Sequence, residues 1–240
     1  MNRIKENNSR WLHTALQNGM LAARKNILAG LILWLFGSAI VGSYYLVPAA
    51  REQFDRLAEI KISWGYIFSI ISTAIFGGVI PSLIAATNNG KTLRRNLFLG
   101  VTNTLLWALK GLEIDWFYRV QATLFGNNQA FSTIVTKTFF DQLVYVPVFG
   151  LVNVVLFVLW RDNNFSCRRF RAALGPHWYA QHVLPVLISN WCVWIPAVLL
   201  IYGLPIGLQL PIQNLVLIFW ILILTFFTSS RQDSPVETAS

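Results

Sequence analysis

Long apolar runs separated by short polar segments dominate this chain. Six such runs cover residues 27–47, 66–86, 96–113, 138–160, 185–203 and 206–228. The hydrocarbon core of a bilayer is about 30 Å thick, and a helix crosses it in about 20 residues. The strict alternation that is typical of transmembrane β-strands does not occur. The pattern therefore predicts an all-α membrane protein, a polytopic bundle of about six transmembrane helices, several of them kinked by proline.

Composition supports this interpretation. Hydrophobic residues make up 55% of the chain and charged residues only 12%, whereas soluble domains carry about 25% charged residues. We expect a basic N-terminal segment at 1–26, a single transmembrane helical domain at 27–228 and a polar C-terminal tail at 229–240. The segment 49–62 predicts a further helix along the membrane surface, because it carries opposite charges four residues apart.

Charge is distributed unevenly between the predicted loops. The chain has 19 Lys and Arg against 10 Asp and Glu. If the six runs alternate in direction, most of the basic residues fall on the side of the two termini, which predicts cytoplasmic termini. We expect the basic loops to contact membrane lipids through anionic headgroups. Nucleic acid is not an expected partner, since no soluble recognition module fits in the loops.

Small residues recur at four-residue steps in the first two runs. Ser38 and Gly42 lie in the first run, and Ser69, Thr73 and Gly77 lie in the second. Such spacing allows helices to approach closely in lipid. Both sets therefore predict packing seams.

The third run carries a polar stripe. Asn96, Gly100, Asn103, Trp107 and Lys110 recur at steps of three and four, so they share one helix face. Lipid cannot satisfy polar groups, and the stripe is expected to face the bundle or a hydrated cavity. The alternative is that the first and last of these residues mark the two membrane interfaces, with the lysine snorkelling.

The fourth run opens with a charged pair. Lys137 and Asp141 lie one turn apart, and Pro147 is expected to bend the helix beyond them. Ionisable residues entering a membrane helix predict a functional site, and the alternative is a structural salt bridge at the interface. Gln209 and Gln213 form another polar stripe in the last run. The predicted pore-lining or gating residues are Asn103, Lys110, Lys137, Asp141, Gln142, Asn153, Gln209 and Gln213.

Two motifs in the later part of the chain resemble a known family. The order Lys137-x3-Asp141-Gln142-x4-Pro147 is similar to a Lys…Asp-Gln…Pro signature of the Mpv-seventeen and peroxisomal membrane protein family. The order Asn190-Trp191-x2-Trp194-x-Pro196, followed by Leu204-Pro205 and Trp220, resembles its second signature. The resemblance as a whole covers about residues 95–228. Gln209 stands where that family has an arginine. The residues assigned to the motifs or to helix anchoring are Trp116, Pro147, Asn190, Trp191, Trp194, Pro196, Pro205 and Trp220.

The resemblance implies a function and a location. Members of the family are small multi-span proteins of organelle membranes, some of which look like weakly selective channels, and relatives occur in bacteria. It implies a channel or permeability protein for small solutes or ions. The alternative is a structural or partner-binding membrane protein without transport activity. The N-terminus shows no targeting pattern, which favours a bacterial inner membrane over the mitochondrial inner or peroxisomal membrane.

Enzymatic chemistry is not expected. The chain lacks Gly-x-Ser-x-Gly and His-Glu-x2-His motifs. His177 and His182 are five residues apart, which does not match the four-residue spacing of a helical zinc pair. We therefore expect no catalytic residue, metal or cofactor. Besides lipids, the expected partner is a second copy of the chain, because six helices form a small bundle for a wide pore.

Overall fold

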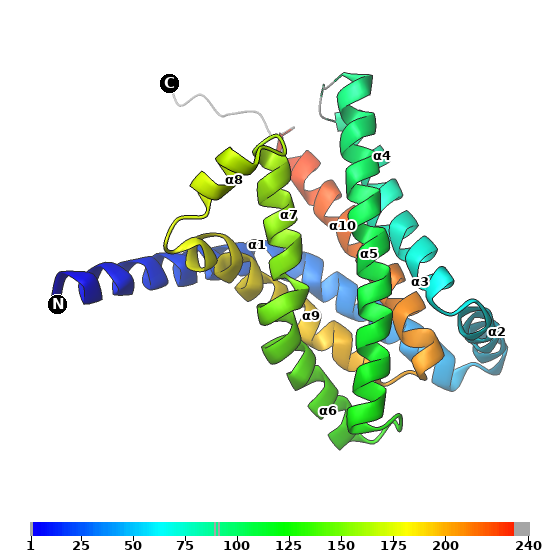
Figure 1. Cartoon of the computed structure of the whole chain (residues 1–240). Helices are drawn as coiled ribbons and strands as arrows, with labels where there is room; N and C mark the ends of the chain where they lie inside the picture. The colour runs from blue at the N-terminus through cyan, green and yellow to red at the C-terminus, as the bar shows by residue number, and fades with distance from the viewer. Residues whose placement is uncertain (1, 89, 91, 233–240) are drawn as a thin grey trace, which may run out of the picture.

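A computed structural model describes residues 2–88, 90 and 92–232 (Figure 1). Over that range the chain is almost entirely helical, and no strand occurs. Three π-helical segments, Ala74–Val79, Asp141–Gly150 and Tyr179–Val183, interrupt or precede α-helices. The α-helices are α1 Asn2–Leu46, α2 Pro48–Trp64, α3 Tyr66–Thr73, α4 Ile80–Asn88, α5 Leu93–Phe125, α6 Phe131–Phe140, α7 Val152–Asp162, α8 Cys167–Ala173, α9 Leu184–Tyr202 and α10 Ile206–Gln232. The predicted all-α bundle is confirmed.

Five helical stretches are long and apolar enough to cross a membrane. They are Asn26–Leu46, Tyr66–Thr87, Leu93–Phe125, Phe131–Asp162 and Tyr179–Tyr202, and they match the first five predicted runs. In α10 the apolar stretch with described side chains is the shorter Ile206–Leu222, so a sixth crossing stays a prediction. The predicted surface helix at 49–62 is α2, which lies at one end of the bundle (Figure 1).

The first helix packs along α9. Asn26 donates to Ser189 Oγ at 3.2 Å, and Trp34 Nε1 donates to the Val193 carbonyl at 2.9 Å. Along the contact between α1 and α9, a Cβ added to Gly37 would lie 3.3 Å from the Leu200 side chain. The apolar core extends from this seam into α5 and α10.

A second seam joins α3 and α4 to α5. A Cβ added to Gly111 would lie 2.2 Å from the Ser69 carbonyl oxygen, and one on Gly78 would lie 2.6 Å from Thr104 Cα. Ser69 and Thr73 are buried in this seam. The predicted packing role of the small residues in the second run is therefore confirmed.

The seam predicted at Ser38 and Gly42 was wrong. Ser38 is exposed, and a Cβ on Gly42 would meet no atom within 4 Å. Small residues four positions apart permit close approach between helices, but α9 packs on another face of α1. That face carries the buried residues Ala29 and Leu33.

The predicted bends coincide with π-helical turns. The segment Ala74–Val79 contains Gly77 and Gly78 and ends just before Pro81, and Pro147 lies inside Asp141–Gly150. Proline lacks an N–H and collides with the preceding turn of an α-helix. A wider turn is one way to relieve that conflict, and such turns are frequent at functional sites.

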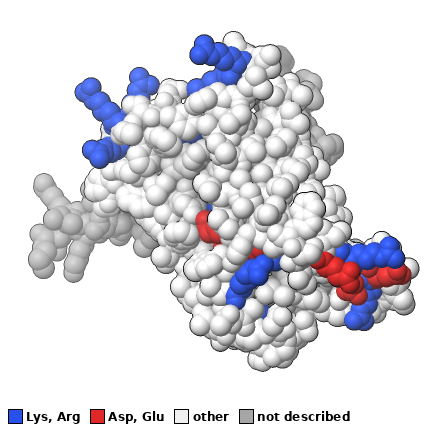
Figure 2. Space-filling model, turned by 45° about the vertical axis from the view of Figure 1, so that its right-hand side comes forward, with Lys and Arg blue, Asp and Glu red and all other residues white. Residues whose placement is uncertain are grey.

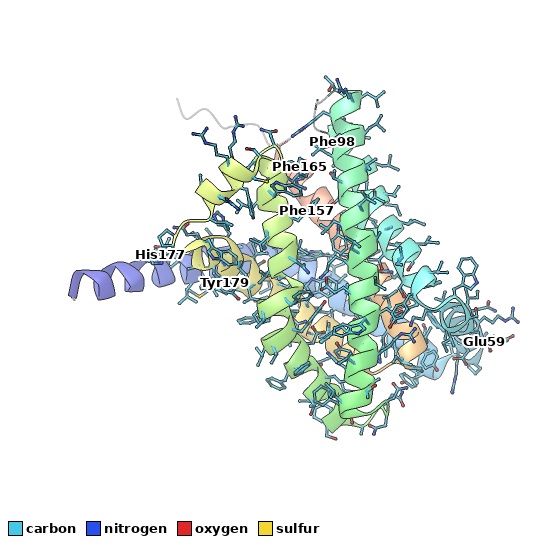
Figure 3. The ribbon with its side chains drawn as sticks, in the orientation of Figure 1. Glu59, Phe98, Phe157, Phe165, His177 and Tyr179 are labelled. Atoms are coloured by element: carbon cyan, nitrogen blue, oxygen red, sulfur yellow. The ribbon has the colours of Figure 1, made fainter. Side chains whose placement is uncertain are left out.

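Charge separates toward the ends of the bundle. Figure 2 shows basic side chains at one end, a mixed acidic and basic cluster at another edge, and a broad face between them with few charges. On α2 the predicted pairs form, with Arg51 3.7 Å from Asp55 and Arg56 2.6 Å from Glu52. In Figure 3, Glu59 points outward from the same helix.

Aromatic rings pack against one another at the end of the bundle where the basic side chains lie, which is called the basic end below. The Phe165 ring contacts Phe98 of α5 at 5.2 Å between centroids and Trp160 of α7 at 5.0 Å. Figure 3 shows Phe98, Phe157 and Phe165 close together near the start of α5 and the end of α7. Arg95 also donates to Asn164 at 3.0 Å. These contacts fix α7 against α5 and so shape the interior between them.

Candidate functional site

A cavity of about 330 Å³ lies inside the bundle. It is partly open, and its wall is formed by α5, the π-helical segment Asp141–Gly150, α7, α9 and α10. Apolar and aromatic side chains form most of its wall, and a few polar groups converge on it from different helices. Such a composition is typical of small-molecule sites. The polar residues of the wall are Lys110, Tyr118, Asp141, Gln142, Tyr145, Asn190 and Gln213.

Lys110 is buried at mid-helix in α5 and only 5% exposed. Its Nζ lies 2.5 Å from Glu113 Oε1 and 3.5 Å from Asn153 Oδ1, and it donates to the Gly150 carbonyl at 2.9 Å. Asn153 donates to the other oxygen of Glu113 at 2.9 Å, and Tyr145 also donates to this carboxylate. Lys110 therefore faces the bundle interior and does not snorkel, and its charge is neutralised by Glu113.

A second ionisable side chain, Asp141, lies on the cavity wall and is 5% exposed. Tyr202 donates to its Oδ2 at 2.6 Å. No ion pair with Lys or Arg forms at this carboxylate among the described residues. Lys137, one turn earlier, is also buried, lies outside the cavity wall and has no ion pair with Asp141. The alternative of a structural Lys137–Asp141 salt bridge is therefore not observed.

The two motifs read from the sequence meet at the cavity. Trp191 Nε1 donates to the Gln142 carbonyl at 2.7 Å, and Asn190 donates to Gln142 Oε1 at 3.5 Å. Trp194 and Trp220 line the cavity. The π-helical segment is thus anchored to α9 through the side chains that the sequence singled out.

Other members of the motif set have different positions. Trp116 is exposed on α5, away from the cavity wall. Pro147 accepts a hydrogen bond on its carbonyl from Tyr179 at 2.8 Å, and Figure 3 shows that tyrosine beside the lower part of α7. Pro196 lies inside α9, and Pro205 lies in the turn before α10.

Glutamines extend polarity beyond the cavity. Tyr118 donates to Gln213, which lines the cavity. Gln209 lies outside its wall, and its Nε2 donates to the Leu204 carbonyl at 3.0 Å while Oε1 has no protein partner. Gln121 is fully buried near the end of α5, and neither polar atom of its side chain has a described partner. Buried polar atoms are nearly always hydrogen-bonded, so these positions call for water or a polar solute.

Asn103 serves a different contact. Its amide donates to the Gly78 carbonyl at 3.3 Å and to Ser82 Oγ at 3.1 Å, which joins α5 to α4. With Asn96 and Gly100 it lines a separate cavity of about 580 Å³ nearer the basic end. The stripe predicted on the third run therefore faces inward, but its two halves line different cavities.

Sequence reasoning missed three residues of the site. Glu113 is three residues after Lys110, and that helical spacing was a signal for it. Tyr145 and Tyr202 come from other segments, and nothing in the local pattern marked them. A further buried carboxylate, Asp115, accepts from Lys61 at 2.7 Å and from Ser69 at 2.8 Å, away from the cavity.

Within the part of the chain that the structure describes, no group of three His, Cys, Asp or Glu side chains could hold a metal ion. No family model, curated protein or solved structure matches the chain. The similarity to the Mpv-seventeen and peroxisomal membrane protein family thus stays a prediction.

Proposed function

We propose that the protein is an integral membrane channel or permeability protein, and that small solutes or ions pass through the cavity between α5, α9 and α10. The observation that carries this proposal is the convergence of Lys110, Asp141, Gln142 and Gln213 on one cavity within helices of membrane-spanning character. Ionisable groups inside membrane helices mark solute and ion paths. The volume falls at the lower end of the range of about 300–1,000 Å³ for small-molecule sites.

The residues of the site have separate roles in this proposal. Asp141 sets the charge of the cavity, and Gln142 and Gln213 supply polar contacts to a passing solute. Tryptophans 194 and 220 narrow the cavity. The Gln121 amide and the Gln209 Oε1 atom have no hydrogen-bond partner and lie outside the cavity wall. They would continue the hydrated path toward the end of α5 and the start of α10.

Orientation follows from the basic end of the bundle. Arg94, Arg168, Arg169 and Arg171 are exposed there, and positive residues collect on the cytoplasmic side of membrane proteins. We place both termini on that side, in a bacterial inner membrane, with anionic headgroups at these arginines. Membership in the Mpv-seventeen and peroxisomal membrane protein family is part of the same proposal, as is assembly into a homo-oligomer.

A structural or partner-binding protein is the second candidate. Other polar groups in the bundle serve as contacts between helices. Asn214 of α10 donates to Ser72 and Thr73 of α3 at 3.0 Å each, and Asp115 joins α5 to α2 through Lys61. Polar side chains of this kind hold membrane helices together without any transport.

Solute flux into liposomes separates the two candidates. The purified chain is reconstituted, and swelling with small neutral and charged solutes is compared with single-channel current in planar bilayers. The test variants are Asp141→Asn and the double variant Lys110→Met/Glu113→Gln. The double variant removes both charges of the Lys110–Glu113 ion pair together. The control is Arg56→Gln, on the exposed face of α2.

We expect flux in the unmodified protein and in the control, and altered rate or selectivity in both test variants. Flux that is identical in all four proteins would remove the cavity from the path. An absence of flux and current across voltage, pH and redox conditions would favour the structural candidate, and stoichiometric co-purification of a partner would then support it.

A further inference from the structure

The two ionisable side chains Lys110 and Asp141 on the cavity wall have different kinds of partner. The ammonium of Lys110 is neutralised by Glu113 at 2.5 Å, and its other contacts are the Gly150 carbonyl and Asn153 Oδ1. Its hydrogen-bonding capacity is therefore taken up by the protein. Asp141, on the same wall, has a tyrosine hydroxyl as its donor and no ion pair with a described cation. The wall thus presents one carboxylate without a matching positive charge.

An ionised carboxylate buried in this way is costly unless it takes up a proton or a cation neutralises it. Lys137 is the nearest basic residue along the chain, and it neither pairs with Asp141 nor lines the cavity. The described basic side chains of α5, α9 and α10 include none besides Lys110 on this wall. A cation that neutralises the ionised form of Asp141 would therefore come from outside the protein.

Aromatic faces surround the same space. An aromatic ring attracts a cation placed over its face, and several rings together form the usual site for quaternary ammonium groups. The wall already holds one such contact, because Lys110 Nζ lies 5.8 Å from the centroid of the Tyr145 ring. The rings of the wall come from four separate parts of the bundle: Trp107, Phe117, Tyr118, Tyr145, Trp194 and Trp220.

We propose that this cavity binds a small organic cation, an amine or quaternary ammonium compound, with Asp141 as its counter-charge and the tryptophan and tyrosine faces around its alkyl groups. An anion would meet Asp141 and find the donors of Lys110 occupied by protein. A small metal ion would find one carboxylate on the wall, Asp141, and no group of three His, Cys, Asp or Glu side chains among the described residues. This inference names the solute class of the proposed path, and for transport it rests on the proposed function.

Binding of choline to the full-length protein in lipid nanodiscs, measured by isothermal titration calorimetry, tests the site. The matched probe is 3,3-dimethylbutan-1-ol, which has the same shape without the charge, and acetate is the anionic probe. We expect choline to bind and the other two to bind at least tenfold more weakly. Equal affinity for choline and its neutral isostere would overturn the proposal.

Two variants and one control connect binding to these residues. Asp141→Asn is expected to weaken choline binding roughly 30-fold or more, because a buried charge loses its partner. Trp194→Leu keeps an apolar wall and should weaken choline roughly 2- to 30-fold while changing the isostere less. Asp162→Asn removes an exposed carboxylate on α7 and should leave choline binding unchanged. If Asp141→Asn fails to fold, Trp194→Leu alone tests the site. A Trp194→Leu protein that binds choline as tightly as the unmodified protein would refute the site.

Liposome flux distinguishes this inference from the proposed function. Choline binding without flux of any solute would keep the cation site and refute the path. Flux of glycerol without preferential choline binding or uptake would keep the path and refute the cation site.

Discussion

Replacing Asp115 by asparagine should destabilise the protein substantially. The carboxylate is 1% exposed and accepts from Lys61 at 2.7 Å, from Ser69 at 2.8 Å and from Arg119 at 3.3 Å. The Lys61 side chain is 4% exposed, so it would become a buried charge without a counter-charge. Removing one partner of a buried pair costs about 3–5 kcal/mol. Arg119 adds little to this cost, because it is partly exposed and rests over the Tyr66 ring.

Unfolding by SDS in mixed micelles, followed by tryptophan fluorescence, measures this change in free energy. The matched control is Glu52→Gln, whose partner Arg56 lies 2.6 Å away on the exposed face of α2. Exposed pairs contribute about 0–1 kcal/mol, so the control should differ little from the unmodified protein. The double variant Lys61→Met/Asp115→Leu removes both charges and should recover most of the lost stability. Equal effects of Asp115→Asn and the control, or a double variant as unstable as Asp115→Asn, would refute this reasoning.

Two further predictions concern packing and an unpaired charge. Gly111→Ala places a methyl group 2.2 Å from the Ser69 carbonyl oxygen and should destabilise the protein by about 1–3 kcal/mol through overpacking. The control Gly42→Ala meets open space and should be neutral or slightly stabilising. Thermal melting compares the two variants, and equal melting temperatures would contradict close packing at Gly111. Lys137→Met removes the ammonium of a buried lysine without an ion pair and should stabilise the folded protein by about 1 kcal/mol or more. The same SDS titration measures this change. A loss of stability would contradict the prediction and show that the lysine has an essential partner.

The periodicity of the sequence predicted the helices and the inward face of α5. Apolar runs set the positions of the spans because each helix must cover about the thickness of the bilayer core. The polar stripe predicted that Lys110 faces the inside of the bundle, because lipid cannot solvate a charge. Both inferences need only residues within one helix.

Partners between distant segments could not be predicted in this way. Tyr202 reaches Asp141 from a segment 61 residues later in the chain, and no local pattern encodes that meeting. The spacing of Lys137 and Asp141 suggested a pair, but the structure has no ion pair between them. The Asp141 carboxylate accepts from Tyr202 of α9 instead.

Water access to the cavity can be measured directly with two valines of the same π-helical segment. Val146 lines the cavity, whereas Val148 is 72% exposed on the outer, lipid-facing surface. Each is replaced by cysteine in a background without Cys167 and Cys192, and a charged, membrane-impermeant thiol reagent is applied in nanodiscs. A hydrated cavity predicts rapid modification of Val146→Cys and little of Val148→Cys, because a thiol in lipid is neither ionised nor reached by the reagent. Slow modification of both would mean that the cavity is dry and that solutes do not pass through it.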